Sequence, residues 1–216
     1  MNTERSQPRH PRSTTVGAVL HGAVAYDLLV WFATLGGDAA FRKEVLQLAR
    51  VAPGETVLDV GCGTGNLAIA AKERVGRNGT VFGVDASVEM LARAVRKATR
   101  KDVAVTFTNG IAQQLPFPDA RIDLVLSTRA LHHLPTKGRE ECIREMRRVL
   151  KPGGRLLAVD FIKGTERRGP LAYFHRHGSV RLEDIVTAVK QADFQEVESG
   201  MLRTGSLGFV FARVGG

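Results

Sequence analysis

The residues that most clearly indicate a chemical function lie in the string VLDVGCGTGN, residues 57–66. In this string Asp59 precedes glycines at positions 61, 63 and 65. Glycine permits positive φ angles and lets a ligand approach the backbone closely. A helix that begins directly after such a loop presents unpaired N–H groups. Asp59 would repel a pyrophosphate, so this loop favours a ligand that carries positive charge.

Two common nucleotide loops do not match this string. A dinucleotide fingerprint has the spacing G-x-G-x-x-G, which would require glycine at the position of Asn66. A phosphate-binding P-loop requires a Lys-Ser/Thr pair after its last glycine, and none follows here. The sequence therefore argues against both ligands.

A second carboxylate, Asp85, ends the apolar stretch TVFGVD. An acidic residue at the end of the second strand of an open α/β sheet accepts hydrogen bonds from ribose hydroxyls. Capping of the next helix is the alternative role, but Ser87 already offers an N-cap. We expect Asp85 to bind a ribose.

Several polar residues lie at or just after the end of the apolar stretch LVLS: Ser127, Thr128, Arg129, His132 and His133. Histidine has the side-chain pKa nearest neutrality, so His132 or His133 is a candidate general base. Both could instead cap or pack a turn. Asp160, at the end of RLLAVDF, either lines the same pocket or is structural.

These residues must be positioned by apolar strands that alternate with helices, a pattern that predicts a mostly parallel sheet covered on both faces. The last two strands have no room for a helix between them and should form an antiparallel edge hairpin. The expected strands are about 56–60, 80–85, 103–108, 124–127, 155–161, 194–199 and 208–214, and the expected helices about 16–34, 38–51, 67–75, 87–100, 137–150 and 182–192. Within the helix ending near residue 100, the apolar positions Val88, Leu91, Val95 and Ala98 have helical spacing.

The composition suits one globular domain: 216 residues, 44% hydrophobic and 25% charged. No apolar run reaches the length of a membrane span, and the basic start lacks the apolar region of a secretory signal. The two cysteines form no disulfide framework or metal-ligand spacing. We therefore expect a cytoplasmic protein without a bound metal.

The net charge of +9 permits contact with nucleic acid, an anionic membrane or an acidic substrate. No aromatic-rich basic strand offers stacking platforms for bases, so nucleic acid is the less favoured partner. The basic residues of two helices are expected on solvent faces: Arg93, Arg96, Lys97, Arg100 and Lys101, and Arg144, Arg147, Arg148 and Lys151.

The loop DVGCGTG resembles the signature of class I S-adenosylmethionine-dependent methyltransferases, an acidic residue followed by G-x-G-x-G. The segment NGIAQQLPFPDARIDLVLS is similar to the family's GDAxxLPFxDxxFDxV, with Ile111 at the usual acidic position. LVLSTRALHHLP and REMRRVLKPGGRLLAVDF continue the match, which is closest to the relatives of ubiquinone/menaquinone C-methyltransferases. The resemblance implies a Rossmann-like seven-stranded sheet and S-adenosylmethionine as cofactor, with S-adenosylhomocysteine as product.

The resemblance also implies the site. Methyl transfer by in-line displacement requires mainly alignment of the acceptor with the methyl group. Tyr26 resembles a lid residue of the quinone enzymes, and Arg129 and His132 lie at the acceptor position. The residues implied for the cofactor are Asp59, Gly61, Cys62, Gly63, Gly65, Asp85, Ala86, Met90, Gly110, Ile111, Ala112 and Ser127.

We expect the chain to divide into a disordered basic tail (1–14), an N-terminal helical lid (15–50) and a class I methyltransferase domain (51–216). We expect a small-molecule or amphipathic acceptor of lipid or quinone type, peripheral contact with an anionic membrane, and a monomer or homodimer. STRALHH stands where the quinone enzymes carry FGxRN, which argues against the identical substrate. An RNA methyltransferase is the alternative, although no NPPY-type motif follows the fourth strand.

Overall fold

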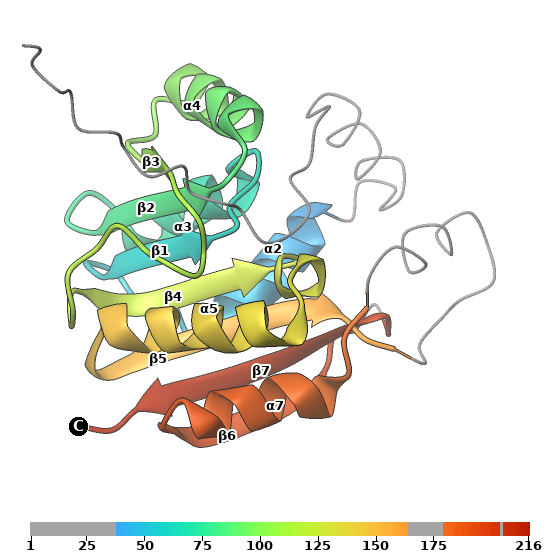
Figure 1. Ribbon diagram of the computed structural model, residues 1–216. Helices are drawn as coiled ribbons and strands as arrows, with labels where there is room; N and C mark the ends of the chain where they lie inside the picture. Colours follow the sequence, from blue (N-terminus) through green and yellow to red (C-terminus); the bar gives the residue numbers. More distant parts are fainter. Residues whose placement is uncertain (1–37, 164–178, 204) are drawn as a thin grey trace, which may run out of the picture.

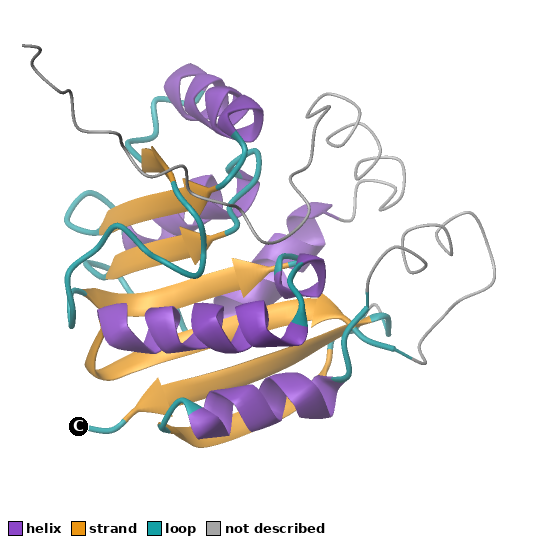
Figure 2. Cartoon of the chain, in the orientation of Figure 1, coloured by secondary structure: helices purple, strands orange, loops and turns teal. Residues whose placement is uncertain are grey.

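A seven-stranded sheet forms the centre of the molecule in this computed structural model, which describes residues 38–163, 179–203 and 205–216 (Figures 1 and 2). The strand order is β3-β2-β1-β4-β5-β7-β6. The pairs β3–β2, β2–β1, β1–β4 and β4–β5 are parallel, whereas β5–β7 and β7–β6 are antiparallel. The strands are β1 Thr56–Val60, β2 Thr80–Asp85, β3 Thr106–Asn109, β4 Ile122–Thr128, β5 Leu150–Phe161, β6 Phe194–Met201 and β7 Leu207–Val214.

Helices cover both faces of this sheet. In Figure 1, α5 and α7 lie in front of it, and α2 and α3 lie behind it. Buried side chains of α5 and α7 share one apolar cluster with the sheet, and those of α2 and α3 share the other. The helices are α2 Asp38–Leu48, α3 Asn66–Val75, α4 Val88–Arg100, α5 Thr136–Val149 and α7 Leu182–Gln191, with a short 3-10 turn, η1, at Leu131–His133.

The predicted fold class is confirmed: a Rossmann-like, mostly parallel sheet with an antiparallel hairpin at its C-terminal edge. The chain order reverses between β1 and β4, because β2 and β3 extend the sheet one way and β4 and β5 extend it the other way. Ligands of open α/β sheets bind at the carboxyl ends of the strands beside such a reversal. The glycine loop directly follows β1 and therefore lies at this position.

Two predicted boundaries were wrong for identifiable reasons. The third strand begins at Thr106 rather than at residue 103, because the amide of Val103 donates to the carbonyl of Ala98 and closes the end of α4. The fifth strand, β5, begins at Leu150 rather than at residue 155, so the KPGG segment at residues 151–154 lies within it. Leu150 pairs with Ile122 and Arg155 pairs with Leu124, so the segment forms an irregularity inside the β4–β5 pair.

The buried face of α4 also differs from the prediction. Val88 and Val95 are 68% and 49% exposed, whereas Met90 and Ala94 are buried together with Leu91. The helix packs beside the start of α3, where a Cβ on Gly65 would lie 2.8 Å from Cβ of Ala94. The apolar spacing therefore identified a helix but assigned two valines to the wrong side.

Several predicted features lie outside the described residues: the tail at 1–14, most of the lid at 15–50 including Tyr26, and most of the connection after β5. Of the expected lid, α2 is described, and its Phe41 and Val45 pack in the apolar cluster shared with α3. Among the described residues, no helix has the length and apolar character to cross a membrane.

Candidate functional site

Positive φ angles shape the glycine loop after β1: 74° at Gly61, 52° at Gly63 and 79° at Gly65. A Cβ on Gly61 would lie 2.6 Å from Cβ of Ala130, and one on Gly65 would lie 2.8 Å from Phe107. These two glycines allow close packing within the protein. A Cβ on Gly63 would meet no described atom within 4 Å, so this glycine leaves open space at the carboxyl edge of the sheet.

The amide groups of this loop bind within the protein. Gly61 and Cys62 both donate to the carbonyl of Val84, at 2.8 and 3.0 Å, and Gly65 donates to the carbonyl of Cys62 at 2.9 Å. Gly63 donates to Oδ2 of Asp85 at 2.8 Å. A pyrophosphate-binding loop would need such amides to point at the ligand, so this arrangement favours a ligand without a phosphate there.

Cys62 belongs to the packing of the loop. The residue is buried, and its Sγ would lie 2.9 Å from a Cβ on Gly83. Burial raises the pKa of the Cys62 thiol well above its usual value, with Asp59 and Asp85 adding to the rise. The thiol is therefore protonated near neutrality and is no nucleophile.

Lys97 holds the far side of the loop, although the sequence placed it on a solvent face. Its Nζ donates to Oγ1 of Thr64 at 2.8 Å and to Oδ1 of Asn66 at 3.0 Å. The contact joins α4 to the loop and to the start of α3. No local pattern in the sequence indicates this contact, because the residues that it joins are more than 30 positions apart.

Asp59 is the most unusual group at the site. The residue is 1% exposed, and neither carboxylate oxygen has a hydrogen-bond partner among the described residues. Burial, with the charge of Asp85 second, raises the pKa of Asp59 to about 7. The Ala68 amide and Arg129 offset part of this rise without providing a hydrogen bond of good geometry.

An unpartnered buried carboxylate is costly for a folded protein. A cationic group placed beside Asp59 would stabilise its charged form, and an ammonium would also donate hydrogen bonds to both oxygens. The buried carboxylate of Asp59 therefore fits a ligand with a positively charged end, as predicted from the glycine loop.

Asp85 links the loop to α4. Its Oδ1 accepts from the amide of Ser87 and its Oδ2 from the amide of Gly63, each at 2.8 Å. Oγ of Ser87 accepts from the amide of Met90 at 3.3 Å, so Ser87 is the N-cap of α4, as predicted. Burial raises the pKa of Asp85. Each carboxylate oxygen retains acceptor capacity toward a hydroxyl group.

The segment after β3 comes to the same edge. The amide of Gly110 donates to the carbonyl of Asp85 at 3.1 Å, and Nδ2 of Asn109 donates to the carbonyls of Asp85 and Ala86. Ile111 then bridges to Gln114 in a tight turn. The structure thus brings Gly110 and Ile111 next to Asp85, as the predicted site requires.

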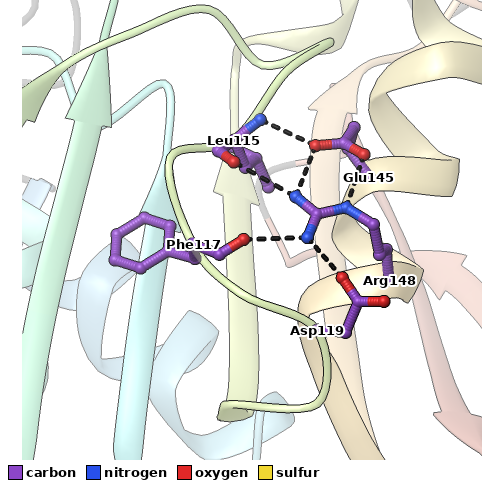
Figure 3. Close-up of polar contacts among 5 residues, drawn as sticks. All are labelled: Leu115, Phe117, Asp119, Glu145 and Arg148. Atoms are coloured by element: carbon purple, nitrogen blue, oxygen red, sulfur yellow. Dashed lines mark hydrogen bonds and ion pairs between the residues drawn. The ribbon is translucent and has the colours of Figure 1, made fainter.

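An ion-pair network fixes the chain that follows this turn (Figure 3). The guanidinium of Arg148 donates to the carbonyls of Leu115 and Phe117, to Asp119 at 2.7 Å and to both oxygens of Glu145. Glu145 in turn accepts from the amide of Leu115 at 2.8 Å. The prediction that Arg148 lies on a solvent face was wrong, and the residue holds this loop against α5.

The polar residues after β4 lie beside the glycine loop. Ser127 is buried, and its hydroxyl has no partner among the described residues. The guanidinium of Arg129 lies 4.8 Å from the ring centroid of Phe41. Ala130 contacts the first glycine of the loop through the close approach described above. His132 and His133 form the turn η1 directly afterwards.

His132 is paired with Asp160, a contact that the sequence did not predict. Its Nδ1 lies 2.6 Å from Oδ1 of Asp160, and its amide donates to Oδ2 at 3.0 Å. The His133 ring lies 3.8 Å from that of His132, and burial lowers the pKa of His133 to about 4, with the charge of His132 second. The two histidines therefore occupy different environments.

Tyr26 lies outside the described residues. Within the described ranges, no three His, Cys, Asp or Glu residues gather as a metal site would require.

Comparison with known proteins shows which proteins this chain is similar to. Residues 57–154 match the family model described as a methyltransferase domain. The crystal structure of a SAM-dependent methyltransferase from Aquifex aeolicus has a TM-score of 0.70 at 23% sequence identity, over 80% of this chain and 89% of that one. Residues 57–154 are therefore similar to a methyltransferase domain, and the chain shares the fold of this solved structure.

Sequence relatives narrow the class. The chain is 35% identical over 169 residues to the ubiquinone/menaquinone biosynthesis C-methyltransferase of Pseudomonas entomophila (strain L48). The aligned residues are 77% of this chain and 65% of that protein. It is 42% identical over 121 residues to the demethylmenaquinone methyltransferase of Listeria monocytogenes serotype 4a (strain HCC23), or 56% of this chain and 50% of the relative. The chain spans less than two thirds of the length of these relatives.

Proposed function

We propose that this chain is an S-adenosylmethionine-dependent methyltransferase that acts on a small-molecule or amphipathic acceptor, of quinone or lipid type. Asp59 is the observation that carries the proposal, because its buried carboxylate has no partner among the described residues and lies directly before the glycine loop. S-adenosylmethionine has an ammonium and a sulfonium, and so supplies the positive charge that this environment favours.

The described residues divide the binding of this cofactor among three segments. Asp59 would face the ammonium end, and Gly63 would leave room for the ligand next to the backbone. Asp85 would accept from the ribose hydroxyls, and Ile111 and Met90 would flank the adenine. The remaining positions proposed at the cofactor are Gly61, Cys62, Gly65, Ala86, Gly110, Ala112 and Ser127.

The bound cofactor would supply an activated methyl group, and the protein would align the acceptor in line with it and exclude water. Arg129 and His132 are proposed to face the acceptor, because they lie within two residues of Ala130, which packs against Gly61 of the loop. Tyr26 is proposed to cover this position. The curated relatives act in quinone biosynthesis according to their names, which supports an apolar ring as acceptor.

The decisive experiment is transfer of labelled methyl groups from S-adenosylmethionine into a cell extract separated into lipid, RNA, protein and small-molecule fractions. Label in the lipid or small-molecule fraction is expected. Label in RNA alone would contradict the proposed acceptor and would favour the alternative RNA methyltransferase.

Calorimetry with S-adenosylhomocysteine tests the cofactor separately. Binding is expected for the unaltered protein and should weaken in Asp85→Ala. If the unaltered protein does not bind S-adenosylhomocysteine, the proposed cofactor is wrong. Unchanged affinity in Asp85→Ala would contradict the ribose contact alone.

A further inference from the structure

The contact between His132 and Asp160 joins two elements that are 28 residues apart in the sequence. Asp160 lies near the carboxyl end of β5 and is 0% exposed, and the side chain of His132 is 9% exposed. Oδ1 of Asp160 lies 2.6 Å from Nδ1 of His132, and the carboxylate accepts from the His132 amide at 3.0 Å and from the Phe161 amide at 2.7 Å. Both oxygens of Asp160 therefore accept from backbone amides.

The arrangement selects one form of the imidazole. An ionised carboxylate can only accept, so Nδ1 of His132 must carry the proton in this contact. In a neutral imidazole, Nε2 is then left with the free lone pair. The Phe161 ring, whose centroid lies 5.4 Å away in an edge-on orientation, and the His133 ring further restrict the position of His132.

The pair lies at the proposed acceptor position. Ala130, two residues before His132, contacts the glycine loop at Gly61. Asp160 follows Val159, which pairs with Thr128 at the end of β4. The pair therefore lies where β4 and β5 end, with His132 on the turn η1 after β4 and Asp160 on β5, at the edge where ligands of this fold bind.

We infer that Asp160 is a positioning residue that holds His132 with Nε2 as the general base for the acceptor. This inference rests on the proposed methyltransferase function and deepens it. It assigns the acceptor to molecules whose nucleophilic atom carries a removable proton, such as a phenol-type hydroxyl or an acidic ring carbon. A thioether or a tertiary amine would have no need of this base.

The step is balanced without another reactant. The acceptor atom forms a bond to the methyl carbon while the bond from that carbon to sulfur breaks, and its electron pair remains on sulfur. The proton of the acceptor goes to Nε2, and Asp160 stabilises the resulting imidazolium through Nδ1–H. The proton then leaves to solvent. The ionisable groups that face this imidazole among the described residues are Asp160 from β5 and His133 from η1.

The first test needs no catalysis. Nitrogen NMR of the full chain labelled with ¹⁵N-histidine should show His132 protonated on Nδ1, with the signal assigned by its loss in His132→Gln. Asp160→Asn should shift His132 toward the other tautomer. Protonation of His132 on Nε2 in the unaltered protein would overturn the inference.

The second test uses labelled S-adenosylmethionine and the extract fraction that the unaltered protein methylates. His132→Gln and Asp160→Asn should each lower kcat by about 10²-fold or more, with the affinity for S-adenosylhomocysteine within about twofold. The rise of kcat with pH should be lost in His132→Gln. Asp193→Asn is the matched control, because this aspartate is 89% exposed in its side chain and lies on the turn after α7.

His132→Gln keeps Asp160 and the backbone contacts of its carboxylate, so it serves if Asp160→Asn fails to fold. An unchanged kcat and pH profile in folded His132→Gln would overturn the inference while leaving the proposed function intact. An unaltered protein that neither binds S-adenosylhomocysteine nor transfers label would instead contradict the proposed function, and with it this inference.

Discussion

At the scale of single residues, Asp59 and Gly63 define what the site can bind. Asp59 is a buried charge without a partner among the described residues, and Gly63 combines a φ angle of 52° with open space beside its Cα. Gly61, two positions earlier, has a similar angle but touches Ala130. Neighbouring residues of one motif therefore divide into ligand contact and internal packing, and substitutions can separate these roles.

Asp59→Asn should weaken binding of S-adenosylhomocysteine about tenfold or more, because it removes the charge proposed to pair with an ammonium group. The pKa of Asp59 is about 7 without ligand, so affinity in the unaltered protein should increase as pH rises from 6 to 8. This increase should be absent in Asp59→Asn. Calorimetry at several pH values measures both effects, and a parallel pH dependence in the two proteins would contradict them.

The same pKa predicts a change in stability. The folded chain binds a proton at Asp59 up to about pH 7, whereas the unfolded chain releases it near the ordinary value of 3.8. Between these values the unfolded state binds fewer protons, so the contribution of Asp59 to stability falls as pH rises. The stability difference between Asp59→Asn and the unaltered protein should therefore grow in favour of the variant from pH 4 to 7. Denaturant unfolding without ligand measures this difference, and a constant value would refute the shifted pKa.

Gly61→Ala should mainly reduce stability, whereas Gly63→Ala should mainly reduce ligand binding. Alanine at 61 would place Cβ 2.6 Å from Ala130 in a left-handed conformation, and we expect a loss of about 2–4 kcal/mol in unfolding free energy. Alanine at 63 meets only the conformational cost of about 1 kcal/mol, but its Cβ projects into the proposed ligand space. Denaturant unfolding and S-adenosylhomocysteine calorimetry on both variants test this separation. A larger stability loss at Gly63 than at Gly61 would contradict it.

At the scale of elements, the loop between β3 and β4 depends on α5. This loop contains no helix that would pair its own backbone groups. Arg148 of α5 donates to its carbonyls, and Glu145 of α5 accepts from the amide of Leu115 (Figure 3). The hydrogen bonds from Arg148 lower the pKa of Glu145 and keep it ionised. Because Ile111 begins the same stretch, this network positions one wall of the proposed cofactor site.

Arg148→Leu should lower the free energy of unfolding by about 2 kcal/mol, since it removes charged hydrogen bonds to a partly buried loop. Affinity for S-adenosylhomocysteine should fall with it. Arg144→Leu is the matched control, because Arg144 is exposed on the same helix. Equal effects of the two substitutions on stability and affinity would show that the network has no special role.

The sequence predicted the elements better than their contacts. Alternating strands and helices and the glycine loop are local patterns, and each predicted strand was found. Contacts between distant segments have no local signal: His132 with Asp160, Lys97 with Thr64, and Arg148 with the β3–β4 loop. Arg148 and Lys97 have the helical spacing of solvent-facing residues, and only the tertiary structure shows which carbonyls and hydroxyls they reach.

At the scale of the whole molecule, part of the positive charge of the described residues is paired. Arg50, Arg155 and Arg213 contact Glu198, Glu55 and Glu196, and these pairs tie the strands of the sheet to each other and to the chain after α2. The outer side of α4 differs, because Val88 and Val95 are exposed there and Arg96 and Arg100 are exposed on the same helix. Exposed apolar residues flanked by cations are typical of helices that lie on anionic membranes.

We therefore predict that the protein binds vesicles containing phosphatidylglycerol and that salt weakens this binding, as electrostatic attraction to an anionic surface requires. Arg96→Glu with Arg100→Glu should reduce binding at least tenfold, because each cation near the surface contributes about 1 kcal/mol. Val88→Ser with Val95→Ser should reduce binding without changing the net charge. Arg144→Glu on α5 is the control for charge alone. Cosedimentation with vesicles measures all four proteins, and an equal loss per charge in Arg144→Glu would show that net charge rather than the outer side of α4 makes the contact.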